Sequence, residues 1–292
     1  MYADHGSPLL PTYQHVLSRS LLDIPLAIVH QRNNPKLDRY VDFFYDLHSN
    51  SAYILMSGGN DRREAEFETF ENNCNQSMLH VIEVIEHQAF ETNKHIPQDN
   101  MLKLSPYVTP KLTTDIVIEK IEYMKRKHQL KPFRALFLYI VGHDPNSDKF
   151  YVSEECRVSL AYLKSTIQCF SNCELLAIIK DFCFAEAFDL LPVSNNTLEG
   201  KHWIQWSCCT SKGKSYTFIP NSRLFSHCIT TAFKGLDCPI KMENCLICAE
   251  YRKWIHNKKI SYKMLQYWIE KHFILLKSKG VTDCDMPVLE LR

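Results

Sequence analysis

Three short apolar segments constrain the fold of this chain more than any other feature of its sequence. They span residues 52–56, 135–141 and 175–179, and glycine or charged residues follow each of them within a few positions. Continuous runs of this length are typical of strands that are covered on both faces of a sheet. An amphipathic helical pattern lies at residues 113–128, and strands that alternate with helices predict a mainly parallel sheet.

The same alternation continues through the rest of the middle of the chain. A polar stretch that contains Pro97, Pro106 and Pro110 is expected to be a loop. We expect further strands and helices, with a small ribbon before the third helix, at these places: strands at 79–85 and 202–207, a helix from about residue 60 to 70, a ribbon at 150–152, and helices at 158–170 and 223–233.

The chain of 292 residues is expected to divide into three parts. Residues 1–50 form an N-terminal extension, residues 51–240 an α/β domain, and residues 241–292 a C-terminal segment that is basic and helical in pattern. The sequence leaves open whether the extension is a pro-segment or part of the sheet.

Composition narrows the classes of function. The net charge of +1 gives no overall attraction to nucleic acid or to an anionic membrane, and eight glycines argue against a glycine-rich phosphate loop. No apolar run approaches the roughly 20 residues of a membrane span, and the N-terminus does not resemble a signal peptide. Several of the twelve cysteines lie in apolar runs, which indicates reduced thiols. We therefore expect a cytoplasmic protein without membrane contact.

Two residues that carry chemistry follow neighbouring predicted strands. His143 comes two residues after one strand, and Cys183 comes four residues after the next. Sites in open α/β sheets form at the carboxyl ends of the strands. A cysteine thiolate is a nucleophile that a nearby imidazole can activate, so the pair predicts a catalytic dyad. The alternative is an inert, buried cysteine and a histidine that faces solvent.

The order of these motifs resembles the caspase-like peptidase fold of caspases, metacaspases and paracaspases. The motifs stand here as Val-Gly-His-Asp at 141–144 and Lys-Asp-Phe-Cys-Phe-Ala at 180–185. The strand at 203–207 and the helix at 224–233 resemble the elements that follow in that family, so the resemblance covers roughly residues 51–235. It implies an α/β fold with a caspase-like, mainly parallel sheet and helices on both faces, plus a C-terminal helical segment.

The resemblance also implies roles for individual residues. Cys183 would attack the scissile carbonyl of a protein or peptide substrate, and His143 would act as acid and base. Backbone N–H groups around Gly142 and Asp144, together with that of Cys183, would hold the oxyanion. The partner would be a peptide substrate, with a homodimer or a caspase-like partner as a further expectation.

Substrate preference would follow from residues beside the nucleophile. The resemblance implies that Asp181 corresponds to the acid that selects arginine or lysine in metacaspases, and that Ser207 is a substrate-binding residue. The alternative for Asp181 is that it caps a helix after the strand. Two departures favour a catalytically inactive binding or regulatory protein as the second hypothesis: Asp144 replaces a glycine, and residues 184–186 lack the glycine that follows the family's cysteine.

Two weaker patterns lie in the C-terminal segment. Cys238, Cys245 and Cys248 could belong to a zinc site with His256 or Cys284 as the fourth ligand, but we favour packing of Cys245 and Cys248 on one helix face. We therefore expect no metal and no cofactor. The basic, aromatic stretch could bind nucleic acid, which is the third hypothesis, but a solvated helix face is the expected role and nucleic acid is not an expected partner.

Overall fold

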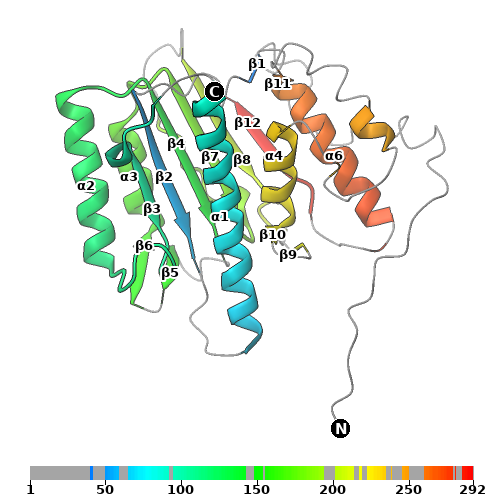
Figure 1. Ribbon diagram of the computed structural model, residues 1–292, viewed down its shortest axis with the longest axis horizontal. Coiled ribbons are helices and arrows are strands. Elements are labelled where there is room, and N and C mark those ends of the chain that lie inside the picture. Colours follow the sequence, from blue (N-terminus) through cyan, green and yellow to red (C-terminus); the bar gives the residue numbers. More distant parts are fainter. Residues whose placement is uncertain are drawn as a thin grey trace.

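A six-stranded, mostly parallel sheet forms the centre of the computed structural model (Figure 1). Its strands lie in the order β12 (Val288–Leu291), β8 (His202–Ser207), β7 (Leu175–Asp181), β4 (Ala135–Val141), β2 (Ser51–Ser57) and β3 (Met101–Leu104). The edge strand β12 is antiparallel to β8, and the other four pairings are parallel. The structure describes residues 40–41, 50–58, 65–91, 95–142, 148–153, 155–193, 201–213, 217–218, 222–234, 238, 245–249, 260–278, 280 and 285–291.

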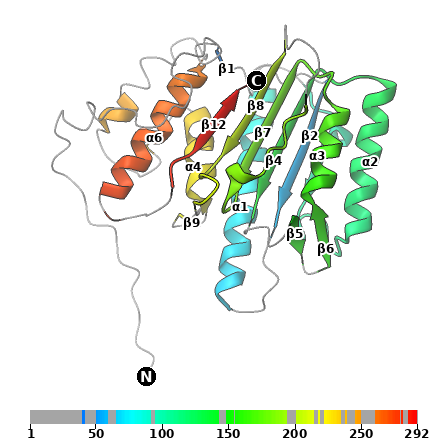
Figure 2. The ribbon, with the colours of Figure 1, turned by 180° about the vertical axis from the view of Figure 1, so that it is seen from behind.

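Helices cover both faces of this sheet. Helices α1 (Ala65–Glu91) and α4 (Leu224–Lys234) lie on one face, and α2 (Thr114–Leu130) and α3 (Leu160–Cys169) lie on the other (Figures 1 and 2). Helix α6 (Tyr262–Ser278) lies beside α4, on the side of β12. The predicted α/β fold with a mainly parallel sheet and two helical layers is therefore confirmed.

The strands that the apolar segments predict are fully buried. All seven residues of β2 and all seven of β4 are buried, and in β7 only the first residue is partly exposed. Strands β4 and β7 pair from Ala135 with Leu175 to Val141 with Asp181. Their carboxyl ends are thus level with each other, which is the arrangement that the predicted dyad requires.

Helix α2 begins and ends where its sequence predicts. Thr113 caps the helix, because its side-chain oxygen accepts a hydrogen bond from the N–H of Ile116. Asp115 lies in the first turn and Lys127 in the last, so both charges favour the helix dipole. Its buried face holds Val117, Ile121, Met124 and His128.

The strand predicted at residues 79–85 was wrong, because these residues lie inside α1. Met78, Val81, Ile82 and Ile85 are buried and follow the i, i+3, i+4, i+7 spacing of one helix face. The β-branched residues imitate a strand when they are considered in a short window. The loop predicted around Pro97 also contains one short strand, β3, which pairs with β2.

Two-stranded pairs complete the described structure. They are β5 (Lys149–Ser153) with β6 (Cys156–Ser159), β9 (Thr217–Phe218) with β10 (Ser222–Arg223), and β1 (Tyr40–Val41) with β11 (Ile260–Ser261). The first pair contains the predicted ribbon, and the last connects the N-terminal part of the chain with the start of α6. Among the residues that the structure describes, no helix is both long and apolar enough to span a bilayer.

Candidate functional site

The carboxyl ends of the parallel strands form one edge, and their hydrogen bonding continues beyond the strands. The N–H of Gly58 donates to the carbonyl of Val141 at 2.9 Å, and the N–H of Gly142 donates to the carbonyl of Asp181 at 3.1 Å. The chain proceeds from β2 to β3 on one side and from β4 to β7 on the other. Such a change of direction marks the place where open α/β sheets bind ligands.

Gly142 is a glycine for steric reasons. A Cβ atom at this position would lie 2.7 Å from the ring of Phe150, which packs across the ends of β2 and β4. Its N–H donates to the backbone carbonyl of Asp181, and its role as an oxyanion donor stays a prediction. His143 and Asp144 follow directly and lie outside the described residues. The contact between His143 and Cys183 therefore stays a prediction.

Cys183 lies two residues beyond the end of β7, at the middle of this edge. Of the cysteines that the structure describes, all are buried except Cys169 and Cys183. Cys183 is partly exposed, whereas Cys169 lies at the far end of α3. The position and exposure of Cys183 fit the predicted nucleophile.

The residue after Cys183 has an unusual backbone conformation. Phe184 is left-handed, with φ 59° and ψ 25°, and its N–H donates to the carbonyl of Gly213 at 2.9 Å. A non-glycine residue in this conformation costs about 1–2 kcal/mol. The turn after Cys183 is therefore formed without a glycine, and Ala185 begins a 3-10 turn directly after it.

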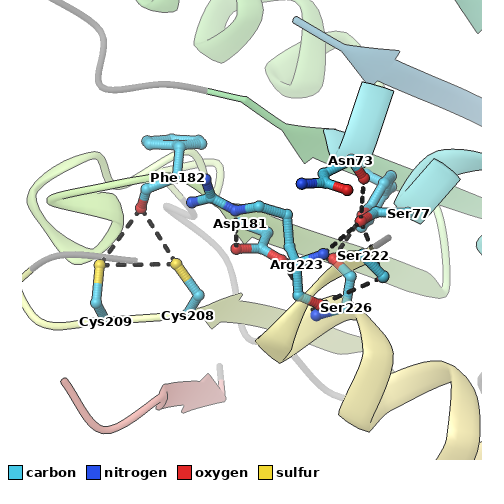
Figure 3. A network of polar contacts seen from close by, with 10 residues as sticks. Asn73, Ser77, Asp181, Phe182, Cys208, Cys209, Ser222, Arg223 and Ser226 are labelled. Carbon is cyan, nitrogen blue, oxygen red and sulfur yellow. Dashed lines mark hydrogen bonds and ion pairs between the residues drawn. The ribbon is translucent and has the colours of Figure 1, made fainter. Parts of the chain in front are cut away.

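Asp181 is fully buried, and its carboxylate is engaged within the protein (Figure 3). Oδ1 lies 3.4 Å from Nε of Arg223, which is 1% exposed. Oδ2 accepts hydrogen bonds from the backbone N–H and the hydroxyl of Ser226, at 3.1 and 2.5 Å. Ser226 lies in the first turn of α4, so Asp181 accepts hydrogen bonds from a helix N-terminus. Helix α4 is not the helix after the strand that the alternative interpretation expected, because β8, β9 and β10 lie between β7 and α4.

Arg223 is held in place by α1 as well as by β7. Its backbone N–H donates to Oγ of Ser77 at 2.8 Å, and Ser77 also contacts the hydroxyl of Ser222 and the carbonyl of Asn73 (Figure 3). Burial alone would lower the pKa of the Arg223 guanidinium, but the Asp181 carboxylate holds it above its ordinary value. No pattern in the sequence pairs Arg223 with Asp181.

Two consecutive cysteines fix the peptide that precedes Cys183. The thiols of Cys208 and Cys209 donate to the carbonyl of Phe182 at 3.2 and 3.3 Å (Figure 3). The hydrogen bond from Cys208 lowers the pKa of Cys209, whereas burial raises that of Cys208. Because the C=O and N–H of a trans peptide point in opposite directions, this arrangement turns the Cys183 N–H away from the two sulfurs.

Ser207 is 3% exposed and pairs with both Lys180 and Val288 in the sheet. Its contact with a substrate stays a prediction. A surface cavity of about 350 Å³ lies elsewhere, against the edge strand β3, where Ile96, Met101 and Lys120 are among its lining residues. Strands β4 and β2 lie between β3 and β7, the strand that precedes Cys183.

The fold of the C-terminal segment brings three cysteines next to one histidine. Cys238, Cys245 and Cys248 surround His272 of α6, and all four are buried. The sequence named the three cysteines but not His272, and its candidate fourth ligands lie outside the described residues. Trp268 of the basic, aromatic stretch is 1% exposed, so its ring is not available to stack on a base.

Of the comparisons with known proteins, the one with solved structures gives a match. No protein-family model matches the sequence, and no curated protein matches it. Among solved structures, the chain is similar to caspase-1 from Spodoptera frugiperda, with a TM-score of 0.48 and 9% sequence identity. The alignment covers 83% of this chain and 86% of that chain.

Proposed function

We propose that the protein is a cysteine endopeptidase in which Cys183 is the nucleophile and His143 is the acid and base. The observation that carries this proposal is the partly exposed Cys183 at the carboxyl edge of a central strand, followed by the left-handed Phe184. Strained backbone persists where the surrounding structure holds it, and such residues cluster at functional sites. The hydrogen bond from Phe184 to Gly213 provides that support.

The reaction would proceed through a covalent intermediate. The Cys183 thiolate attacks the scissile carbonyl, a C–S bond forms, and the carbonyl oxygen takes up the negative charge. The protonated His143 then donates its proton to the leaving amine as the C–N bond breaks, and water hydrolyses the thioester. The Cys183 N–H is the oxyanion donor in this proposal, since Gly142 already donates to Asp181.

The preference for a basic residue has less support than the dyad. Asp181 would have to exchange the Arg223 guanidinium for the side chain of a substrate, yet both residues are buried. Removing one member of a buried ion pair is unfavourable, because the other charge remains without a partner. The proposal therefore covers peptide hydrolysis and leaves the residue before the scissile bond to experiment.

The test is hydrolysis of fluorogenic peptides that end in arginine, in aspartate or in an apolar residue, with the purified full chain. Cys183→Ala and His143→Ala should each lower the rate of the best substrate by more than about 10³-fold. Cys169→Ala is the matched control, because Cys169 is the most exposed cysteine among the described residues, and it should leave the rate unchanged.

One set of contacts favours the second candidate, a caspase-like binding or regulatory protein without catalysis. Asp181 and Ser207 are buried, and the Gly142 N–H is engaged, so these candidate site residues serve the fold. Equal, low hydrolysis of every peptide by the wild type and by Cys183→Ala would support this candidate and overturn the peptidase proposal.

A further inference from the structure

Three cysteines and one histidine converge in the C-terminal part of the described structure. The Sγ atoms of Cys238, Cys245 and Cys248 lie 3.8, 3.8 and 3.4 Å from Nε2 of His272. All four potential ligand atoms lie within 4.8 Å of one another, and all four residues are buried. The cluster is remote in sequence from Cys183.

Hydrophobic packing alone does not explain this arrangement. Burial of cysteines as small apolar groups has no directional preference. Nε2 of His272 has one lone pair and can accept one S–H hydrogen bond, yet three sulfurs lie around it. A cation at the centre of the four atoms would satisfy all of them at once.

The orientation of His272 prepares Nε2 for such a cation. Its Nδ1 lies 2.8 Å from the carbonyl oxygen of Trp268, one turn earlier in α6. A carbonyl only accepts, so Nδ1 carries the proton and Nε2 presents its lone pair to the sulfurs. Histidines that bind metals commonly donate their other N–H to a carbonyl or carboxylate in this way.

The spacing of the cysteines is that of metal-binding loops. Cys245 and Cys248 form a Cys-x2-Cys pair on one helical turn, in which the N–H of Ala249 donates to the carbonyl of Cys245 at 2.9 Å. The turn places both sulfurs on the same side. This spacing is common in structural zinc sites.

We propose that Cys238, Cys245, Cys248 and His272 bind one Zn²⁺ ion in a closed tetrahedral site. Tetrahedral Zn–S and Zn–N bonds place neighbouring ligand atoms about 3.6–3.8 Å apart. The three S–N distances of 3.4–3.8 Å match this spacing. Thiolate and imidazole ligands favour zinc over magnesium or calcium, and four protein ligands leave no position for a substrate.

The ion would act on the fold and not on the peptidase reaction. Cys238 follows α4, and Cys245 and Cys248 precede α6, which carries His272. Zinc would therefore connect the segment between α4 and α6 to α6 itself. Helix α6 leads to β12, the edge strand of the sheet. Metal binding at such a site is coupled to folding.

The experiment measures the metal content of the full chain by elemental mass spectrometry. The protein is expressed with zinc and purified without chelator under reducing conditions. The wild type should hold about one zinc per chain. Cys248→Ser and His272→Ala should lose it, and His272→Cys should retain it, because cysteine is also a zinc ligand. Cys156→Ser is the matched control, since Cys156 is equally buried but lies in β6, and it should retain zinc.

A second measurement uses only the wild type, so it does not depend on whether the variants fold. Cobalt added to the metal-depleted wild type should give the visible absorption of a tetrahedral thiolate complex, and zinc should abolish it. Absence of zinc from the wild type together with absence of this spectrum would overturn the proposal. Zinc retained by Cys248→Ser and His272→Ala, or a disulfide between two of the three cysteines in the wild type, would also overturn it.

Discussion

The buried ion pair between Asp181 and Arg223 offers a quantitative test of the network beneath the candidate site. Arg223→Met replaces the guanidinium with an unbranched apolar side chain. The Asp181 carboxylate, which is 0% exposed, is then left without its cation. Breaking a buried pair from one side costs about 3–5 kcal/mol of unfolding free energy. At about 2–4 °C per kcal/mol for a large domain, the melting temperature should fall by about 6–20 °C.

The assay is urea unfolding followed by tryptophan fluorescence, because Trp203, Trp206 and Trp268 are fully buried. Arg134→Met is the matched control: Arg134 pairs with Glu174 at 2.6 Å, but both side chains are more than half exposed. That surface pair should contribute only about 0–1 kcal/mol.

A second variant separates the charge from the packing. Combining Arg223→Met with Asp181→Asn removes the unpaired charge, while the asparagine oxygen can still accept from Ser226. The double variant should be more stable than Arg223→Met alone. A cost for Arg223→Met no larger than that for Arg134→Met would refute the reasoning.

Two further predictions concern the neighbouring strands. Burial lowers the pKa of Lys180 from 10.5 to about 7, so between these values the unfolded chain holds a proton that the folded chain lacks, and stability rises with pH. The free energy of unfolding of Lys180→Met, measured by urea unfolding from pH 6 to 10, should therefore exceed that of the wild type by the largest amount at pH 6. A difference between the two proteins that is independent of pH would contradict this. Gly142→Ala should cost about 1–3 kcal/mol, because its Cβ would meet the Phe150 ring, and Phe150→Leu in the same chain should recover part of the loss of melting temperature; no recovery would contradict the steric explanation.

The sequence predicted those elements whose hydrophobic pattern fits only one kind of secondary structure. Strands β4 and β7 are continuous apolar runs between turns, and the structure places them at nearly the expected residues. Residues 79–85 were misassigned because β-branched side chains on one face of a long helix resemble a strand in a short window. The edge strand β3 was missed because it is only four residues long and lies in a polar stretch between Pro97 and Pro106.

The candidate site was predictable only where strand ends determine it. The place of Cys183 follows from the end of β7, whereas the partner of Asp181 lies 42 residues later in the chain. A single arginine before an apolar helix does not indicate which carboxylate it contacts. His272 was missed although it lies between His256 and Cys284, the two candidate fourth ligands, because spacing alone does not show which of the nearby residues α6 brings to the cysteines. A histidine on the apolar face of that helix was the available signal.

The most direct test of the proposed nucleophile is alkylation of Cys183 by iodoacetamide, followed residue by residue with mass spectrometry. An unactivated thiol reacts mainly above about pH 8, where the thiolate becomes abundant. With His143 as its partner, Cys183 should react at about pH 6.5 at least 10-fold faster than Cys169, and His143→Ala should remove the difference. Equal rates for Cys183 and Cys169 at every pH in the wild type would contradict the account.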